Sequence, residues 1–248
     1  MQKSYPLISG HNRLNWVQWI LILLANVVAY CCLLLPYFIE LPNNLIFDYD
    51  HPLLIAALFK IIIVSLFLFI QIITLRLITG HEWRHLFHRP TLKELGIALI
   101  FFILTYVISI VTGLISKSLF SSVSGSAAAG LSIKTPHVWG IFAYERLTSA
   151  IQIMGEEFLA LMPFLAFTRL ADYFNLPKAT WWGNIISSLI FSLLHLSTYD
   201  FNIGYVILGL TFTRIILTWS YQKTQNIWIS FLVHYLFDTL SFLALLFA

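Results

Sequence analysis

Ionisable side chains are rare and costly within apolar stretches, and five of those that lie in such stretches of this sequence have types and spacings that could do chemistry. They are Glu156, Glu157, His195, His234 and Asp238. Residues four apart share a helix face, so His234 and Asp238 are expected to project in the same direction. Glu157 is expected to point roughly 100° away from Glu156 around its helix. These residues are therefore candidates for a functional site inside a membrane.

The chemistry open to such a set is hydrolysis. A carboxylate in a low-dielectric pocket can act as a general base that activates a water molecule. A histidine can hydrogen-bond to the same water molecule or polarise a carbonyl group. A second histidine with a neighbouring hydrogen-bonding side chain can hold a developing oxyanion. These roles predict peptide-bond hydrolysis without a covalent nucleophile. Two histidines and one carboxylate are also a catalytic zinc set, so the residues alone leave that alternative open.

The composition indicates an integral membrane protein. The chain has 248 residues, of which 59% are hydrophobic and 10% charged, and its mean hydropathy is +0.85. Soluble domains carry about 25% charged residues. The net charge is +3, and the basic residues lie in short loops rather than in one stripe. These features exclude a soluble globular enzyme, a disordered tail and a nucleic-acid partner.

Seven apolar runs are long enough to cross a bilayer, whose core of about 30 Å needs roughly 20 residues of helix. They predict an all-α, polytopic membrane protein with about seven transmembrane helices and one membrane domain over residues 1–248. Between the third and fourth runs, Ser121–Gly130 is a loop by composition. The runs are Trp16–Ile39, Leu53–Ile78, Leu95–Phe120, Phe142–Thr168, Thr180–Leu196, Ile203–Tyr221 and Ile227–Phe247.

The fourth, fifth and seventh runs must position the ionisable residues. If the fourth and fifth form a hairpin, its turn falls near Asp172–Lys178, and the midpoint between Glu156 and His195 lies in that turn. The two side chains are then at similar depth, because both helices rise by about 1.5 Å per residue. Asp238 lies a comparable distance inside the seventh run. The site is therefore predicted between these three helices.

The distribution of Lys and Arg predicts the orientation in the membrane. One set of alternate loops holds nine basic residues and the opposite set holds two, which are Lys117 and Lys134. The N-terminus is thus expected in the cytoplasm, and residues 79–94 form a basic cytoplasmic loop. Near the outer interface we expect Glu145 and Arg146 to form a local pair, without a catalytic role. The nine residues are Lys3, Arg13, Arg76, Arg84, Arg89, Lys93, Arg169, Lys178 and Lys223.

Three motifs resemble those of the CAAX protease and bacteriocin-processing family, also called CPBP or Abi. Glu156-Glu157 stands where the family has Glu-Glu-x-x-x-Arg. Phe191-Ser-Leu-Leu-His195 looks like Phe-x-x-x-His, and His234-Tyr-Leu-Phe-Asp238 looks like His-x-x-x-Asn/Asp. Their order, spacing and placement on late spans all match. The resemblance covers residues 140–245, which form the expected catalytic core.

The resemblance implies an intramembrane glutamate-dependent endopeptidase of a bacterial plasma membrane. Glu156 is implied to activate water with help from His195, while His234 and Asp238 lie at the oxyanion side and Glu157 supports the site. The implied substrate is a membrane-associated peptide or protein, in peptide maturation or bacteriocin self-immunity. The bilayer is the other partner. No organic cofactor is implied, and no metal is expected.

Two departures from the family pattern bear on activity. Leu161 occupies the position of the family's arginine, and Asp238 ends the last motif instead of asparagine. Arg146 or Arg214 could supply the missing charge, although Arg146 lies about three turns from Glu157 on the same helix. The alternative is a non-catalytic membrane scaffold or immunity protein of the same fold. A proton-relaying transporter is disfavoured by the lack of inverted repeats.

A rival motif lies in the basic loop. His81-Glu82-Trp83-Arg84-His85 fits His-Glu-x-x-His, which on an α-helix places two zinc ligands on one face with the glutamate as base. A zinc metalloprotease using His81, Glu82 and His85 is therefore a further alternative. The segment follows Gly80 and precedes Pro90, and no third ligand stands at the usual distance. A juxtamembrane helix at the lipid interface is the favoured interpretation.

Overall fold

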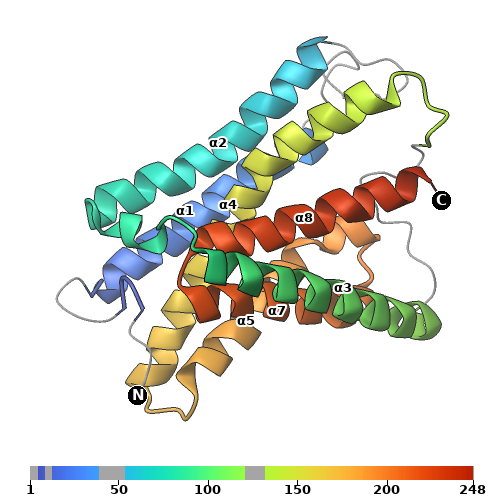
Figure 1. The fold of residues 1–248 in the computed structure, drawn as a ribbon. Helices are drawn as coiled ribbons and strands as arrows, with labels where there is room; N and C mark the ends of the chain where they lie inside the picture. The colour runs from blue at the N-terminus through green and yellow to red at the C-terminus, as the bar shows by residue number, and fades with distance from the viewer. Residues whose placement is uncertain (1–4, 9–12, 39–53, 121–131, 248) are drawn as a thin grey trace.

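The computed structural model describes residues 5–8, 13–38, 54–120 and 132–247, and over these ranges its regular secondary structure is helical throughout, joined by short turns and loops. This confirms the predicted all-α polytopic fold. The predicted loop Ser121–Gly130 lies outside the described residues. The longer helices in Figure 1 are α1 (Trp16–Phe38), α2 (Leu54–Thr79), α3 (Leu92–Phe120), α4 (Val138–Tyr173), α5 (Ala179–Leu194), α7 (Thr211–Thr224) and α8 (Ile227–Leu246).

Among the described residues, six helical segments are long and apolar enough to cross a membrane. They correspond to six of the seven predicted runs. The exception is α5, which has 16 residues and ends at Leu194, so that it is shorter than the predicted span. By contrast, α4 has 36 residues and extends beyond both predicted ends.

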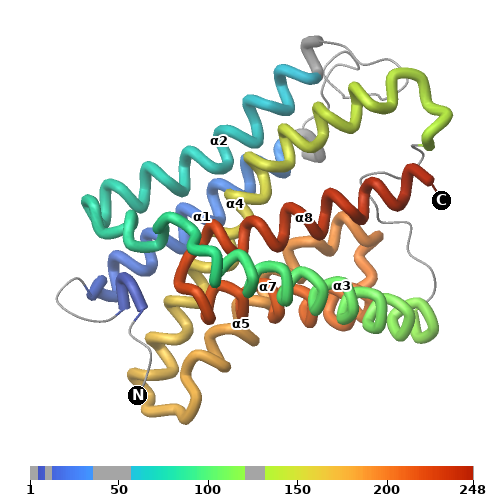
Figure 2. The backbone as a smooth tube through the Cα atoms, in the orientation of Figure 1, coloured from blue at the N-terminus to red at the C-terminus, as the bar shows by residue number. Residues whose placement is uncertain are grey.

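The centre of the molecule is α4. In its most apolar window 78% of the residues are buried, against 22% in α1, 28% in α2 and 22% in α3. Helices α1 and α2 pack on one side of α4, whereas α3, α7 and α8 pack against one another on the other side (Figure 2). The outer helices therefore present apolar side chains to lipid, and the polar face of α4 is enclosed by protein.

Side chains define where several helices begin. Asn15 and Gln18 form a reciprocal capping box at the start of α1, with bonds of 2.8 and 2.9 Å between each side chain and the other backbone N–H. Thr91 and Glu94 form the same motif at the start of α3. The side chain of Asn226 accepts a bond from the backbone N–H of Trp228 and caps α8.

The predicted hairpin turn at 172–178 is confirmed, since α4 ends at Tyr173 and α5 begins at Ala179. The two helices approach each other closely at Gly183. A Cβ atom at this position would lie 2.7 Å from the carbonyl oxygen of Phe164 and would overlap the hydroxyl of Thr168. Glycine is therefore required for the contact that sets the relative positions of the first two motifs.

The sixth predicted run is not one regular helix. It begins with α6 (Ile203–Tyr205), continues as a π-helical segment (η4, Val206–Leu210) and then becomes α7. Short π-helical segments widen a helix by one residue and often occur at functional sites. This irregular stretch precedes Arg214, which lies in the first turn of α7.

Candidate active site

The site is built on the buried middle of α4. Glu156 is 7% exposed and Glu157 is 1% exposed. Gln152, one turn earlier, donates a hydrogen bond of 2.7 Å from Nε2 to Glu156 Oε1. The preceding residue, Gly155, leaves room for the ring of Phe67 on α2, which a Cβ atom there would overlap. One carboxylate oxygen of Glu156 is thus held by an amide.

Glu157 is fixed by an arginine from a different helix. Arg214 of α7 donates from Nη1 to Glu157 Oε1 at 2.7 Å and from Nη2 to Oε2 at 3.0 Å. Arg214 is 2% exposed, so both charges are removed from solvent. A bidentate guanidinium–carboxylate pair is the geometry in which a buried ion pair is best stabilised.

His234 of α8 joins the first motif to the third. Its Nδ1 lies 2.9 Å from Glu157 Oε1. Because a carboxylate paired with Arg214 only accepts hydrogen bonds, Nδ1 carries the proton and donates it. The other nitrogen, Nε2, lies 3.9 Å from Glu156 Oε2 and 3.7 Å from Asp238 Oδ2. Glu157 therefore orients the ring so that Nε2 faces the other two carboxyl groups.

His195 lies at the C-terminal end of α5 rather than within a span. Its Nδ1 donates a 2.9 Å hydrogen bond to the carbonyl oxygen of Phe191, which leaves Nε2 available. Among the described residues no direct hydrogen bond or ion pair joins His195 to Glu156.

Phe191 forms an apolar wall shared by three polar side chains. The centroid of its ring lies 4.6 Å from that of His195 and 6.4 Å from that of His234. The Cζ atom of Arg214 lies 4.8 Å from the same centroid. The first residue of the second motif is therefore a packing surface, and it holds the groups of α5, α7 and α8 in one place.

Tyr199 was not predicted as a site residue. It lies in the short 3₁₀ helix η3 (Leu196–Tyr199) and stacks on Tyr205, with 5.3 Å between ring centroids. Burial raises the pKa of Tyr199 to about 12, and the charges of Tyr205, Asp238 and Glu156 act in the same direction. Its hydroxyl therefore stays protonated near neutral pH. Its position four residues after His195 was a sequence signal too weak to identify it.

The structure distinguishes the two residues, Arg214 and Arg146, that could replace the arginine missing at position 161. Arg214 lies on Glu157, whereas the Cζ atom of Arg146 lies 4.6 Å from the ring centroid of Phe242 and 5.8 Å from that of Phe142. The expected pair between Glu145 and Arg146 is wrong. Glu145 instead accepts from Lys60 Nζ of α2 at 2.6 Å, because adjacent residues on a helix point about 100° apart.

The rival motif does not have the geometry of a zinc site. Residues Glu82–Leu86 form a 3₁₀ helix (η2), whose three residues per turn do not place His81 and His85 on one face. His85 Nε2 lies 3.4 Å from Glu82 Oε2 instead. Within the described ranges, no group of three or more His, Cys, Asp and Glu side chains is arranged to hold a metal ion, at this segment or at the candidate site.

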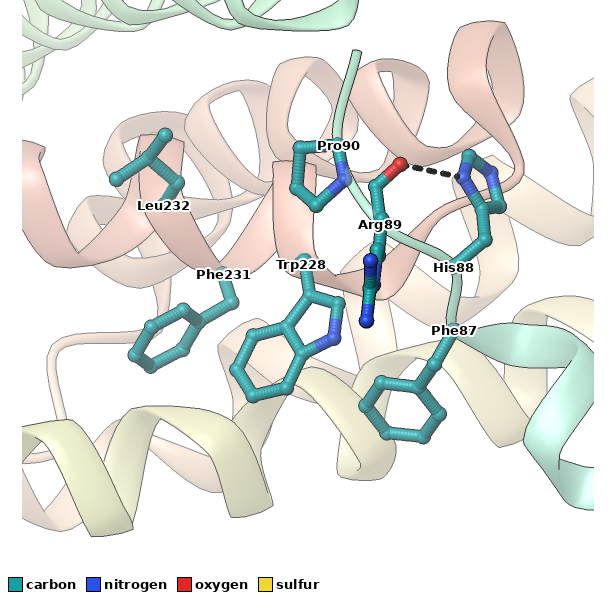
Figure 3. Close-up of a pocket in the computed structure, with 7 residues that line it drawn as sticks. All are labelled: Phe87, His88, Arg89, Pro90, Trp228, Phe231 and Leu232. Carbon is teal, nitrogen blue, oxygen red and sulfur yellow. Dashed lines mark hydrogen bonds between the residues drawn. The ribbon is translucent and has the colours of Figure 1, made fainter.

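A separate groove of about 360 Å³ lies at the junction of the η2–α3 connection and the start of α8 (Figure 3). It contains none of the motif residues and is almost entirely apolar. Phe87 and Trp228 both line it and pack edge to face, with 5.5 Å between ring centroids. The groove is lined by Phe87, His88, Arg89, Pro90, Trp228, Phe231 and Leu232.

Comparison with known proteins identifies the segment that holds the motifs. Residues 146–240 match the family described as Type II CAAX prenyl endopeptidase Rce1-like. No curated protein and no solved structure gives a significant match to the chain. The matched segment begins in α4, ends in α8 and includes the five predicted site residues and Arg214. This segment is therefore similar to the CAAX protease family, in agreement with the resemblance that its motifs carry.

Proposed function

We propose that this protein is an intramembrane glutamate-dependent endopeptidase that hydrolyses a peptide bond of a membrane-associated peptide or protein. The observation that carries the proposal is the contact of Glu157 with both Arg214 and His234. It joins three helices and turns His234 Nε2 toward Glu156. A protein that served only as a scaffold would not need these groups converging inside the membrane.

In the proposed reaction Glu156 acts as the general base. A water molecule between Glu156 and His195 Nε2 loses a proton to the Glu156 carboxylate as its oxygen attacks the scissile carbonyl carbon. Gln152 orients the carboxylate through its bond to Oε1. The same proton is then delivered to the leaving amine, so Glu156 returns to its ionised form when the C–N bond breaks.

His234 and Asp238 are assigned to the oxyanion side. A doubly protonated His234 donates from Nδ1 to Glu157 and from Nε2 to the negative oxygen of the tetrahedral intermediate. Asp238 lies 3.7 Å from Nε2 and helps to keep that proton on the ring. Arg214 keeps Glu157 ionised and in place, so Glu157 and Arg214 position the histidine rather than contact the substrate.

The scaffold alternative rests on the absence of an arginine at Leu161. Arg214 supplies a cation to Glu157 from α7, which supports the proposal of an active site over that of a scaffold. The predicted setting is a bacterial plasma membrane, with the N-terminus in the cytoplasm. Roles in peptide maturation or bacteriocin self-immunity belong to the same proposal.

The experiment is peptide cleavage by purified protein in liposomes, with a library of quenched fluorescent peptides. Wild type is compared with Glu156→Gln and His195→Ala, and Glu82→Gln serves as the matched control because it removes a glutamate outside the site. Replacing the general base is expected to lower kcat by about 10²- to 10⁴-fold. Full activity of Glu156→Gln would overturn the proposal.

A further inference from the structure

The groove between the η2–α3 connection and α8 has walls that are fixed to each other. Asn226 is fully buried and donates from Nδ2 to the carbonyl oxygen of His88 at 3.0 Å. Its Oδ1 accepts from the backbone N–H of Trp228, as the cap of α8. One side chain therefore holds both segments, and the ring of Phe87 packs on that of Trp228.

The groove lies where two apolar helices begin. Helix α3 begins at Leu92 and α8 at Ile227, and both are long and apolar enough to cross a membrane. Leu232 lines the groove, and Leu236, one turn further along α8, is 42% exposed, so the apolar surface continues out of the groove. Tryptophan, here Trp228, is typical of the boundary between lipid headgroups and acyl chains. The acyl chains of surrounding lipids are therefore the apolar groups that reach this groove.

Arg89 places a guanidinium group at this apolar surface. In Figure 3 its side chain points in the same direction as the rings of Phe87 and Trp228. The planar N–H donors of a guanidinium group bind phosphate through charge-assisted hydrogen bonds. Basic side chains near the membrane surface also attract anionic lipids. An anionic headgroup is thus the complement of Arg89, as an acyl chain is of the rings beside it.

The two carboxylates nearest to Arg89 in the sequence do not neutralise it. Glu94 caps α3 through Oε2, and its Oε1 lies 3.4 Å from His88 Nε2. Glu82 Oε2 lies 3.4 Å from His85 Nε2. In the part of the chain that the structure describes, no ion pair joins a carboxylate to Arg89. Its guanidinium group therefore remains available to an anion from outside the chain.

We propose that this groove is a binding site for one anionic phospholipid. An acyl chain packs on Trp228, Phe231 and Leu232, and the phosphate accepts hydrogen bonds from Arg89. The groove volume of about 360 Å³ falls within the range of about 300–1,000 Å³ that is typical of ligand pockets. None of the five motif residues lines the groove, so the inference goes beyond the proposed endopeptidase activity and does not depend on it.

Quenching of Trp228 by brominated lipids tests this site in the full chain. The protein is reconstituted in phosphatidylcholine liposomes, and phosphatidylglycerol or phosphatidylcholine with brominated acyl chains is added at increasing mole fraction. The chain has eight tryptophans, so the signal of Trp228 is the difference between each protein and its Trp228→Phe counterpart. We expect phosphatidylglycerol to quench Trp228 with about a fivefold or greater preference over phosphatidylcholine.

Variants of two arginines assign this preference to the groove. Arg89→Gln is expected to abolish most of it, and Arg89→Lys to retain part of it because the charge remains. Arg84→Gln is the matched control, since Arg84 is also exposed and lies in the same basic segment but does not line the groove. A diffuse attraction of anionic lipid by the whole segment would fall equally in both glutamine variants. Both arginines are exposed, so the substitutions are expected to leave folding intact.

Equal quenching by the two lipids, a preference that survives Arg89→Gln, or equal losses in Arg89→Gln and Arg84→Gln would overturn the inference. Relief of quenching by added glycerol 3-phosphate would assign Arg89 to a soluble phosphate, and would overturn it as well. No quenching of Trp228 by either lipid would show that another group, such as a second copy of the chain, covers the groove, with the same consequence. The proposed function fails separately, through retained cleavage by Glu156→Gln.

Discussion

Arg214 and Glu157 form a bidentate ion pair between α7 and α4, at 2.7 and 3.0 Å, with both side chains almost wholly buried. The family pattern places an arginine on the same helix as the glutamates, at the position of Leu161. Here a cation comes from another helix and reaches Glu157. The pair is thus a tertiary contact, and it couples the packing of α7 to the orientation of His234.

Arg214→Met is expected to lower both stability and kcat. Removing one partner of a buried ion pair costs about 3–5 kcal/mol, and a displaced His234 costs about 100-fold in rate. Adding Leu161→Arg to Arg214→Met should restore part of kcat, because residue 161 lies one turn from Glu157. Thermal unfolding and single-turnover cleavage would measure both effects. Wild-type kcat in Arg214→Met would contradict the positioning role.

Gly183→Ala is expected to destabilise the protein by about 1–3 kcal/mol, because the new Cβ atom overlaps Thr168 and lies 2.7 Å from the Phe164 carbonyl oxygen. Gly113→Ala is the matched control. A Cβ atom at Gly113 meets nothing within 4 Å, so alanine there should be neutral or stabilise α3 by about 0.5–1 kcal/mol. Equal unfolding temperatures for the two variants would show that the α4–α5 contact is looser than described.

The pair of Lys60 and Glu145 is expected to act on stability alone. Lys60→Met leaves the buried carboxylate of Glu145 without this cation, whereas Lys60→Met with Glu145→Gln removes the charge as well. The double variant should therefore unfold at a higher temperature than the single one, and both should keep the kcat of wild type. A double variant less stable than Lys60→Met would argue against this account of the pair.

We expect the ionisation of Tyr199 to lower the stability of the folded protein at alkaline pH. Burial raises its pKa from 10.0 to about 12, so the folded state holds this proton more tightly than the unfolded state. Its contribution is fully present below about pH 10 and is lost as the pH rises through about 12. Tyr199→Phe should flatten the stability curve between these values, as measured by chemical denaturation. An unchanged slope would indicate that Tyr199 titrates normally.

The sequence predicted the helices well because long apolar runs have few alternatives in a membrane. It also predicted the α4–α5 turn. The spacing of His234 and Asp238 correctly indicated one face of α8, and their side chains lie 3.7 Å apart. These features depend on the local spacing of residues, which can be read directly from the sequence.

Contacts between distant residues were harder to predict. Arg214 could be proposed as a substitute for the missing arginine, and a direct contact of Arg146 with Glu157 could be excluded by their separation along one helix. The contact of Arg214 with Glu157 could not be predicted, since it depends on how α7 packs against α4. The pairing of Lys60 with Glu145 joins residues 85 positions apart and has no periodic signal. His195 was predicted inside a span, yet α5 ends one residue before it, because the chain turns there into a 3₁₀ helix.

The central claim is that Glu156 is the base of a hydrolase that needs no zinc motif in the basic loop. The most direct test is cleavage by wild type, Glu156→Gln, His195→Ala and His81→Ala, each with and without a zinc chelator. We predict cleavage that resists the chelator, is lost in Glu156→Gln and His195→Ala, and persists in His81→Ala. Cleavage that is abolished by the chelator and by His81→Ala, but retained in Glu156→Gln, would contradict the account.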